Sequence, residues 1–582
     1  MLYKQPKHGF SSCRTLEIPP KVFNFAVQIY FLKDTIIFNL INSMRKLFLS
    51  TLAFFCIAFG LLQAQNPQVK TSDGILEGLD RSGVKVFKGV PFAAPPVGDL
   101  RWKAPQPVQK WDGVRLAHEY GPNPMQEAVF GDMNFGTKEM SEDCLYLNIW
   151  TPAKTMSEKL PVLIYFNGGG LMAGSGSEPR YAGWSMARKG IISITANYRE
   201  GIFGFFAHPE LSREAAYKGS GNYGFLDQVA AIAWVKKNIA AFGGDPSRIT
   251  IVGESAGSIS VSLLMASPLC QGLFAQAMGS SGAVHGFGNI PTLKEAEAQG
   301  EAKMKELNCR SVADLRAIPA EELMRKAAVK SMPSCNLDNY FMPEQPLKIY
   351  SEGKQAQVPL LVGGNSCEMV PMAILAGKPA TIENLKAGAR ATFGDAVDKV
   401  FELYGLNTDA DVLSQKGVDL ASDLFLAYGT WKWGNMHKLT GNSPVYRYFY
   451  SHPRPDMIDK SKVAGLAGGV QDKKAGEESR PAPKISGAVH SADIEYAMGT
   501  LSTNLVFDWQ PEDFWVSEIF QNYYANFVKT GNPNGLGLPE WTPTTGQAVP
   551  PVLHLDVETF QTADKQLEER YQFIDSILSP KE

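Results

Sequence analysis

The stretch Arg248-Ile-Thr-Ile-Val-Gly-Glu-Ser-Ala-Gly257 decides the fold of this chain. Its apolar side chains predict a buried strand, its G-x-S-x-G pattern predicts a sharp turn, and the small and apolar side chains of 258–264 predict a helix. Gly253 and Gly257 remove side chains that would collide in such a turn. The turn lifts the Oγ of Ser255 clear of the sheet and aims a helix N-terminus at it. Ser255 is therefore a candidate nucleophile, although a serine in an ordinary tight turn has the same pattern.

Two further buried strands are expected at 161–166 and 191–196, and a helix at 226–242. The first of these strands ends in Asn167-Gly-Gly-Gly170. Consecutive glycines leave backbone N–H groups free of Cβ bulk, as an oxyanion hole requires, although a flexible turn has the same composition. Alternating strands and helices predict an α/β fold with a doubly wound parallel sheet, in which sites lie at the carboxyl ends of strands. We therefore expect Ser255 and the glycine loop to meet at one edge of the sheet.

An acid and a base can be sought further along the chain. Glu368 follows another apolar strand, 358–364, where a carboxylate can orient an imidazole, although most such glutamates are merely solvated. If the chain order is serine, acid, histidine, the base lies beyond Glu368. His490 is favoured because it sits in a loop of small residues. The alternatives are His437, His452 and His554.

The composition bounds the function. The 582 residues contain no Ser- or Gly-rich linker, which favours one large domain with insertions. A net charge of −3 gives no basic surface for nucleic acid, so no nucleic-acid partner is expected. No C-x-x-C pair or His/Cys cluster has metal-binding spacing. We expect neither a metal nor another cofactor.

The N-terminal region has the pattern of a secretory signal. Met44-Arg-Lys46 is followed by an apolar run, 47–62, and by Leu62-Gln-Ala64. The run is shorter than the roughly 20 residues of a spanning helix. We expect 44–64 to be a cleaved signal peptide and 1–43 to lie upstream of the true start. The mature protein, a single domain of 65–582, would then be periplasmic or secreted without a stable membrane anchor. The alternative is an uncleaved anchoring helix.

Seven motifs spread over 68–560 carry a family resemblance. They are Phe87-Lys-Gly-Val-Pro-Phe-Ala93, Ser141-Glu-Asp-Cys-Leu-Tyr-Leu-Asn148, Asn197-Tyr-Arg199 with Gly204-Phe-Phe206, Gly221-Asn-Tyr-Gly-Phe-Leu-Asp-Gln228, Phe242-Gly-Gly-Asp-Pro246, Gly253-Glu-Ser-Ala-Gly257 and Ala525-Asn-Phe-Val-Lys-Thr-Gly-Asn-Pro-Asn534. With them the chain resembles the type-B carboxylesterases, the family of carboxylesterases and cholinesterases. The resemblance implies an α/β-hydrolase fold: a doubly wound, mostly parallel sheet with helices on both faces and a helical covering layer.

The resemblance also implies a function, that of a serine ester hydrolase acting through an acyl-enzyme. An exported esterase of this kind is expected to act on small or carbohydrate-linked acyl or aromatic esters. A secreted lipase is the first alternative, but the polar, Lys-rich loop 461–479 does not resemble an apolar lid. A catalytically silent, esterase-like adhesion protein is the second. The implied site consists of Ser255 as nucleophile, Glu368 as acid, His490 as base, and the N–H groups of Gly169, Gly170 and Ala256 as the oxyanion hole.

Three departures from the family pattern matter. The usual His or Tyr before the glycines is Asn167, whose amide could clamp the loop. Cys144 lacks its usual earlier partner, since Met125 stands about where that cysteine would be; we expect a buried free thiol. The tryptophan that cholinesterases present to quaternary ammonium is replaced by Asn134 or Phe135, which disfavours choline esters.

Overall fold

The structure is a computed structural model that describes residues 32–33, 36–37, 39–48, 50–51, 66–328, 332–466, 469–473 and 486–579. Internal contacts divide the chain into two units, Met1–Asn66 and Pro67–Glu582. In the first unit the described residues up to Thr51 are helical. Most of the expected upstream segment 1–43, and the expected signal segment beyond Thr51, lie outside the described residues. No helix in the described part of the chain is long and apolar enough to span a membrane.

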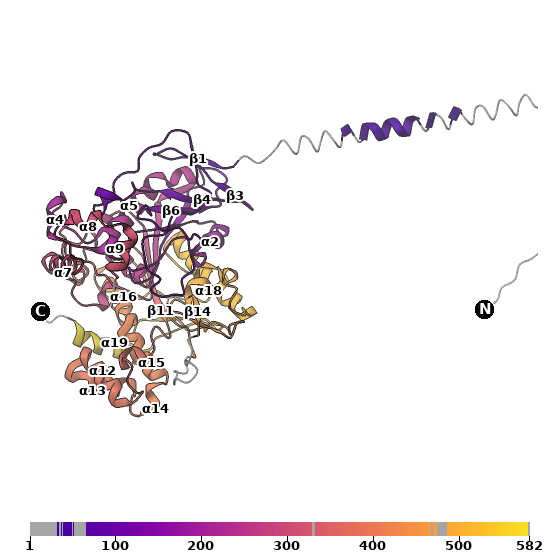
Figure 1. Cartoon of the computed structure of the whole chain (residues 1–582). Helices are drawn as coiled ribbons and strands as arrows, with labels where there is room; N and C mark the ends of the chain where they lie inside the picture. The colour runs from indigo at the N-terminus through magenta and orange to yellow at the C-terminus, as the bar shows by residue number, and fades with distance from the viewer. Residues whose placement is uncertain are drawn as a thin grey trace, which may run out of the picture. The chain divides into compact units, whose positions relative to one another are not determined.

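The second unit is built around a sheet that has 11 strands in the described part of the chain (Figure 1). Its order is β16-β15-β12-β11-β10-β9-β7-β8-β6-β4-β3. The strands from β15 to β8 are parallel, and the remaining strands at both edges are antiparallel. The bounds are β3 (Leu79–Arg81), β4 (Val84–Pro91), β6 (Tyr146–Thr151), β7 (Leu160–Phe166), β8 (Ile192–Ala196), β9 (Gly244–Glu254), β10 (Gln276–Ser280), β11 (Leu360–Asn365), β12 (Val445–Tyr450), β15 (Val552–Leu555) and β16 (Phe560–Thr562).

The central strands are apolar along their length because both faces of the sheet are covered. In β7, Val162 and Ile164 belong to one buried hydrophobic cluster, whereas Leu163 and Tyr165 between them belong to another. Helices α5 (Tyr223–Asn238), α6 (Ala256–Ala266) and α16 (Tyr428–Thr440) contribute to the first cluster. Helices α2 (Trp184–Arg188), α17 (Asp493–Met498) and α18 (Pro511–Thr530) contribute to the second. The predicted doubly wound fold is confirmed.

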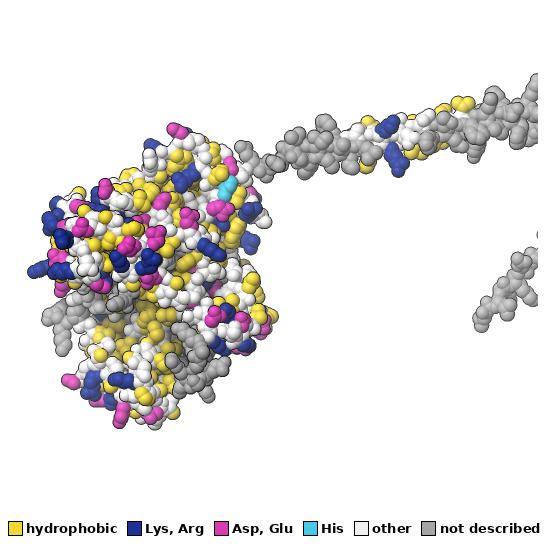
Figure 2. Space-filling model, viewed as in Figure 1, with side chains coloured by type: hydrophobic (Ala, Val, Ile, Leu, Met, Phe, Trp, Pro, Cys, Tyr) yellow, Lys and Arg dark blue, Asp and Glu magenta, His cyan; other side chains and the backbone are white. Residues whose placement is uncertain are grey.

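The remaining helices form covering layers with hydrophobic clusters of their own. One layer contains α3 (Gly201–Phe205), α4 (Pro209–Glu214), α7 (Leu293–Glu306), α8 (Val312–Ala317) and α9 (Ala320–Lys326). The other contains α11 (Met372–Leu375), α12 (Ile382–Phe393), α13 (Val397–Tyr404), α14 (Asp409–Val412), α15 (Gln415–Ser422) and α19 (Lys565–Leu578), which Figure 1 shows gathered at one end. A short helix, α10 (Pro346–Ser351), packs on the main core. Acidic and basic side chains are interspersed over the face seen in Figure 2.

Two predicted segments differ in detail. The helix expected at 226–242 begins earlier, as α5, and its last residues form a 3-10 turn, Ile239–Phe242. The segment expected to be a loop at 461–479 contains a hairpin of β13 (Lys462–Ala464) and β14 (Val470–Asp472) within its described part. A three-stranded sheet of β1 (Gln68–Lys70), β2 (Ile75–Glu77) and β5 (Val114–Leu116) lies beside the main sheet.

Candidate active site

Ser255 lies in the turn between β9 and α6, with φ 55° and ψ −123°, a conformation that non-glycine residues rarely adopt. Gly253 and Gly257 are required because other backbone atoms lie too close to their Cα atoms to leave room for a side chain. A Cβ on Gly253 would lie 2.2 Å from the carbonyl carbon of Gly257, and a Cβ on Gly257 would lie 2.2 Å from the carbonyl oxygen of Phe166. The predicted sharp turn is therefore present, and its serine is partly exposed.

The structure brings the three predicted triad residues into one hydrogen-bonded chain. His490 Nε2 lies 3.0 Å from Ser255 Oγ, and His490 Nδ1 lies 2.6 Å from Glu368 Oε2. Glu368 is 1% exposed, and its other oxygen accepts hydrogen bonds from the Asn365 N–H and the Ser281 hydroxyl, each at 2.6 Å. The carboxylate is thus fixed from one side and bound to the imidazole on the other.

The glycine loop lies beside the serine. A Cβ on Gly168 would be 3.1 Å from Ser255 Cβ. Gly169 and Gly170 have φ values of 102° and 64°, and the Gly169 carbonyl accepts the N–H groups of Met172 and Ala173 in a tight turn. Within the described residues, neither Gly169 nor Gly170 donates its own N–H to a protein acceptor. Those two groups are available to a ligand.

Asn167 clamps this loop with its side chain. Its Nδ2 donates to the Gly168 carbonyl at 3.0 Å and to Glu200 Oε1 at 3.1 Å, while the Tyr198 hydroxyl donates to the Asn167 carbonyl at 2.9 Å. The amide also packs against Gly174, where a Cβ would lie 2.0 Å from Nδ2. The hydrogen bonds expected of the amide are therefore present.

This arrangement contains the groups required for nucleophilic acyl transfer. An imidazole bonded to a serine hydroxyl can take its proton, and a carboxylate on the opposite ring nitrogen can orient and stabilise the imidazolium. Backbone N–H groups beside the serine can bind an oxyanion.

Comparison with known proteins agrees with this chemistry. The model of the carboxylesterase family matches residues 65–574. The chain belongs to the carboxylesterase family. It is a carboxylic ester hydrolase. A fumonisin B1 esterase of Sphingopyxis macrogoltabida is 36% identical over 460 residues, covering 74% of this chain and 83% of the relative. A medium-chain fatty acyl-CoA hydrolase precursor of Anas platyrhynchos is 32% identical over 569 residues, covering 91% and 95%.

Solved structures of the family share the fold. A PNB esterase aligns with a TM-score of 0.70 and 29% identity, covering 88% of this chain and all of the other chain. A carboxylesterase of Geobacillus stearothermophilus at pH 6.2 aligns with a TM-score of 0.72 and 29% identity, covering 87% and 99%. The α/β-hydrolase architecture is therefore common to this carboxylesterase and its structural neighbours.

The alternative histidines have other partners in this carboxylesterase. His437 is fully buried, with its ring nitrogens near the Val358 carbonyl and Gln355. His452 lies between two aspartates, and His554 Nε2 lies 2.7 Å from the Thr562 hydroxyl. None of these rings is hydrogen-bonded to Ser255, so His490 is the histidine that the geometry favours.

A second carboxyl group, which the sequence reasoning did not single out, approaches the same imidazole. Glu254 Oε1 lies 3.4 Å from His490 Nε2 and accepts the Ser491 hydroxyl at 2.6 Å. Burial raises the pKa of Glu254 to about 7, despite the opposing charge of His490. Burial lowers the pKa of His490, but Glu254 and Glu368 together raise it to about 9. In the sequence, Glu254 occupies the first variable position of the G-x-S-x-G motif, and nothing there indicated that it would approach the histidine.

The expected free thiol is confirmed. Cys144 is buried and in no disulfide, and it lines a small cavity together with Met125. Burial raises the pKa of Cys144 well above its ordinary value. The thiol is therefore a core side chain and not a reactive one.

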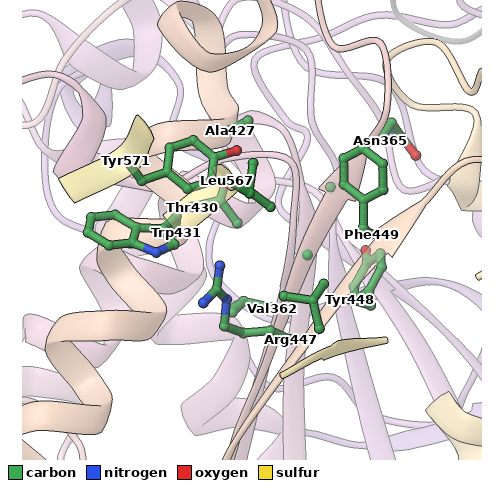
Figure 3. Close-up of a pocket in the computed structure, with 13 residues that line it drawn as sticks. Val362, Asn365, Ala427, Thr430, Trp431, Arg447, Tyr448, Phe449, Leu567 and Tyr571 are labelled. Atoms are coloured by element: carbon green, nitrogen blue, oxygen red, sulfur yellow. The ribbon is translucent and has the colours of Figure 1, made fainter. Parts of the chain in front are cut away.

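A second cavity, of about 50 Å³, is lined by residues of β11, β12 and α16 and by none of the triad residues (Figure 3). Arg447 and Trp431 project into it, and both contact Glu568, at 3.4 Å from Arg447 Nη1 and 2.9 Å from Trp431 Nε1. The polar groups of Arg447, Trp431 and Glu568 are thus hydrogen-bonded to one another, so we assign this cavity no role in binding a substrate. In the described part of the chain, no group of three or more His, Cys, Asp or Glu side chains could hold a metal ion.

Proposed function

We propose that this carboxylesterase cleaves esters through a Ser255–His490–Glu368 triad and a covalent acyl-enzyme. The observation that carries the proposal is the hydrogen-bonded chain from Ser255 Oγ through His490 to Glu368, at 3.0 and 2.6 Å, on a strained strand-to-helix turn. Ser255 and Glu368 come just after the parallel strands β9 and β11, and His490 comes from the loop before α17. A chance arrangement of a serine, an imidazole and a carboxylate in this order is improbable.

The reaction begins with proton transfer from Ser255 Oγ to His490 Nε2 as the oxygen attacks the ester carbonyl carbon. The tetrahedral intermediate then collapses, and His490 donates the proton to the leaving alcohol. A water molecule enters, loses a proton to His490 and attacks the acyl carbon. The bond from that carbon to Ser255 Oγ then breaks, His490 returns the proton to Oγ, and the acid leaves. Glu368 holds Nδ1–H throughout and stabilises the imidazolium.

The oxyanion of each tetrahedral intermediate is bound by the N–H groups of Gly169, Gly170 and Ala256. Ala256 is the first residue of α6, so its N–H has no partner within the helix and points toward the turn. Gly169 and Gly170 supply donors that no protein acceptor occupies in the described chain. Donors fixed before the reaction stabilise the developing charge without reorganisation.

The proposed substrates are small or carbohydrate-linked acyl or aromatic esters outside the cell. Export is supported by the signal pattern of 44–64, and the mature enzyme is proposed to be the single domain 65–582. The named activities of the relatives, a fumonisin B1 esterase and a fatty acyl-CoA hydrolase among them, differ widely and do not favour one ester.

A panel of esters tests the proposal with purified 65–582. It should contain p-nitrophenyl esters of short and long acyl chains, feruloyl esters and acetylated sugars. We expect turnover of short p-nitrophenyl esters and of at least one feruloyl or acetyl-sugar ester. Preference for long acyl chains would identify a lipase instead, and a folded protein inactive on all of them would identify the silent adhesion protein.

A further inference from the structure

The segment Tyr198–Gly201 braces the glycine loop from behind at three points. The Tyr198 hydroxyl donates to the Asn167 carbonyl at 2.9 Å, the Asn167 amide donates to Glu200 Oε1 at 3.1 Å, and the Gly201 N–H donates to the Leu171 carbonyl at 2.8 Å. The two glycines of the proposed oxyanion hole lie between these points. The contact between Glu200 and Asn167 is the one of the three that joins two side chains; the other two end on backbone carbonyls.

The brace is itself rigid, because Arg199 in its centre is tied to helix α5. Asp227 of α5 accepts the Arg199 backbone N–H at 3.0 Å, and its two oxygens accept Nε and Nη2 at 2.8 Å each. Both side chains are buried. A bidentate buried pair of this kind fixes the backbone on either side of it, so Glu200 has a defined position.

Glu200 is an unusual residue to find there. It is 1% exposed, forms no ion pair with any described residue, and has Asn167 as its hydrogen-bond partner. Burial raises the pKa of Glu200 well above its ordinary value, although hydrogen bonds from Asn167 and Tyr198 oppose this. Burial therefore favours the neutral form of this carboxyl. Burying a carboxyl without a cation costs stability, so a purely structural position would be better filled by an apolar side chain.

We propose that Glu200 is a positioning residue for the oxyanion hole and acts through the side chain of Asn167; this inference rests on the proposed function. Asn167 Nδ2 has two hydrogens, one for Glu200 and one for the Gly168 carbonyl. Glu200 thus sets the rotation of the amide, and the amide sets the direction of the Gly168 carbonyl. That carbonyl and the Gly169 N–H belong to one planar peptide unit, so fixing the first aims the second.

Four variants test the inference. Glu200→Ala removes the acceptor, Glu200→Gln keeps a side-chain oxygen in its place, and Asn167→Ala and the double variant Glu200→Ala/Asn167→Ala complete a cycle. Because loss of one oxyanion donor costs about 10²–10³ in kcat, we expect misdirecting one to lower kcat about 10- to 100-fold with KM nearly unchanged. Glu200→Gln should recover most of the kcat. The double variant should be no slower than Asn167→Ala alone, since both remove the same contact.

The matched control is Asp338→Ala. Asp338 is also a fully buried carboxyl whose pKa burial raises, but it accepts the N–H groups of Tyr340 and Met342 and has no contact with the glycine loop. Its removal should leave kcat near that of the wild type. A folded Glu200→Ala enzyme with wild-type kcat, or equal losses in Glu200→Gln and Glu200→Ala, would overturn the inference.

Hydrogen exchange of the peptide 167–174 gives a reading that does not depend on catalysis. Glu200→Ala should accelerate exchange there, whereas Glu200→Gln and Asp338→Ala should not. Unchanged exchange in Glu200→Ala would contradict the inference even if the wild-type protein hydrolysed no ester. Absence of activity in the wild type alone would instead reject the proposed function.

Discussion

Two carboxyl groups approach the His490 imidazole, one at each ring nitrogen, and we expect them to set the pH dependence of the site. Glu368 bonds His490 Nδ1 at 2.6 Å, while Glu254 lies 3.4 Å from Nε2, the nitrogen that faces Ser255. Both glutamates are buried, so their influence is only weakly screened by water. The free enzyme must release the proton held among these groups before His490 can act as a base.

Glu254→Gln should therefore move the acid limb of the kcat/KM profile to lower pH. The carboxylate raises the pKa of His490 from 6.5 toward about 9, so replacing it with a neutral amide lowers that pKa and frees the base at lower pH. The measurement is kcat/KM for a p-nitrophenyl ester between pH 5 and 10. Asp338→Asn should leave the limb unmoved, and a limb that stays in place or rises in Glu254→Gln contradicts the argument.

The sequence revealed residues that belong to motifs, but not their partners from distant segments. Ser255 was identifiable because the glycines around it imply a turn, and Asn167 because it follows a strand and precedes three glycines. Glu200 and Ser281 carried no such signal. Each acts through one hydrogen bond to a residue far away in the chain, and only the folded sheet brings those segments together.

Secondary-structure elements were predicted well where both faces of a strand are buried, and poorly where the strands are largely exposed. Strands β7 and β8 were predicted within one residue of their bounds, because apolar runs covered on both faces have few alternatives. The hairpin β13–β14 was taken for a loop because its strands are short, polar and half-exposed. The early start of α5 was missed because its first turn overlaps a glycine-rich motif.

An ion cluster joins three elements of the fold. His452, just past β12, bonds Asp513 in the first turn of α18 at 2.9 Å and Asp556, just past β15, at 3.0 Å. Burial lowers the pKa of His452, but hydrogen bonds and charge from the two aspartates raise it to about 9. The imidazolium therefore links the sheet edge to helix α18 at neutral pH.

Replacing His452 with Gln should destabilise the fold at pH 6 more than at pH 9.5. A histidine whose folded pKa is raised contributes its stability fully below the unfolded value of 6.5 and loses it as pH rises through about 9. Because Asp556 is partly exposed, we expect roughly 1–2 kcal/mol at pH 6. Denaturant unfolding of wild type and variant at both pH values measures this.

His437→Gln is the control for that experiment. Burial lowers the pKa of His437, so its difference from wild type should stay level or grow between pH 6 and pH 9.5. A destabilisation by His452→Gln that is equal at the two pH values would show that the ring packs without carrying a charge.

For the whole molecule, the sheet explains why the site lies where it does. Ser255 follows β9, the glycine loop follows β7, and Glu368 follows β11, all parallel strands whose carboxyl ends meet at one edge. This placement followed from the sequence because parallel order dictates it. How the covering helices pack against one another did not follow from the sequence, because their apolar stripes do not specify a partner.

Processing is a whole-molecule property that one experiment can test. Expressed from Met44 in a bacterial host, the protein should be recovered outside the cytoplasm with Gln65 as its first residue, because the pattern of 44–64 is that of a cleaved signal. N-terminal sequencing and intact mass give the answer. Retention of 44–64 in a membrane-bound product would support the uncleaved anchor instead.

We propose Ser255 as the nucleophile of a triad with His490 and Glu368. The kcat/KM of Ser255→Ala on a p-nitrophenyl ester tests it most directly, with folding checked by circular dichroism and thermal unfolding. Since losing a triad member costs on the order of 10⁴-fold or more, we predict at least that loss in a variant that unfolds at the wild-type temperature. A folded Ser255→Ala enzyme that keeps a tenth of the wild-type activity would contradict the claim.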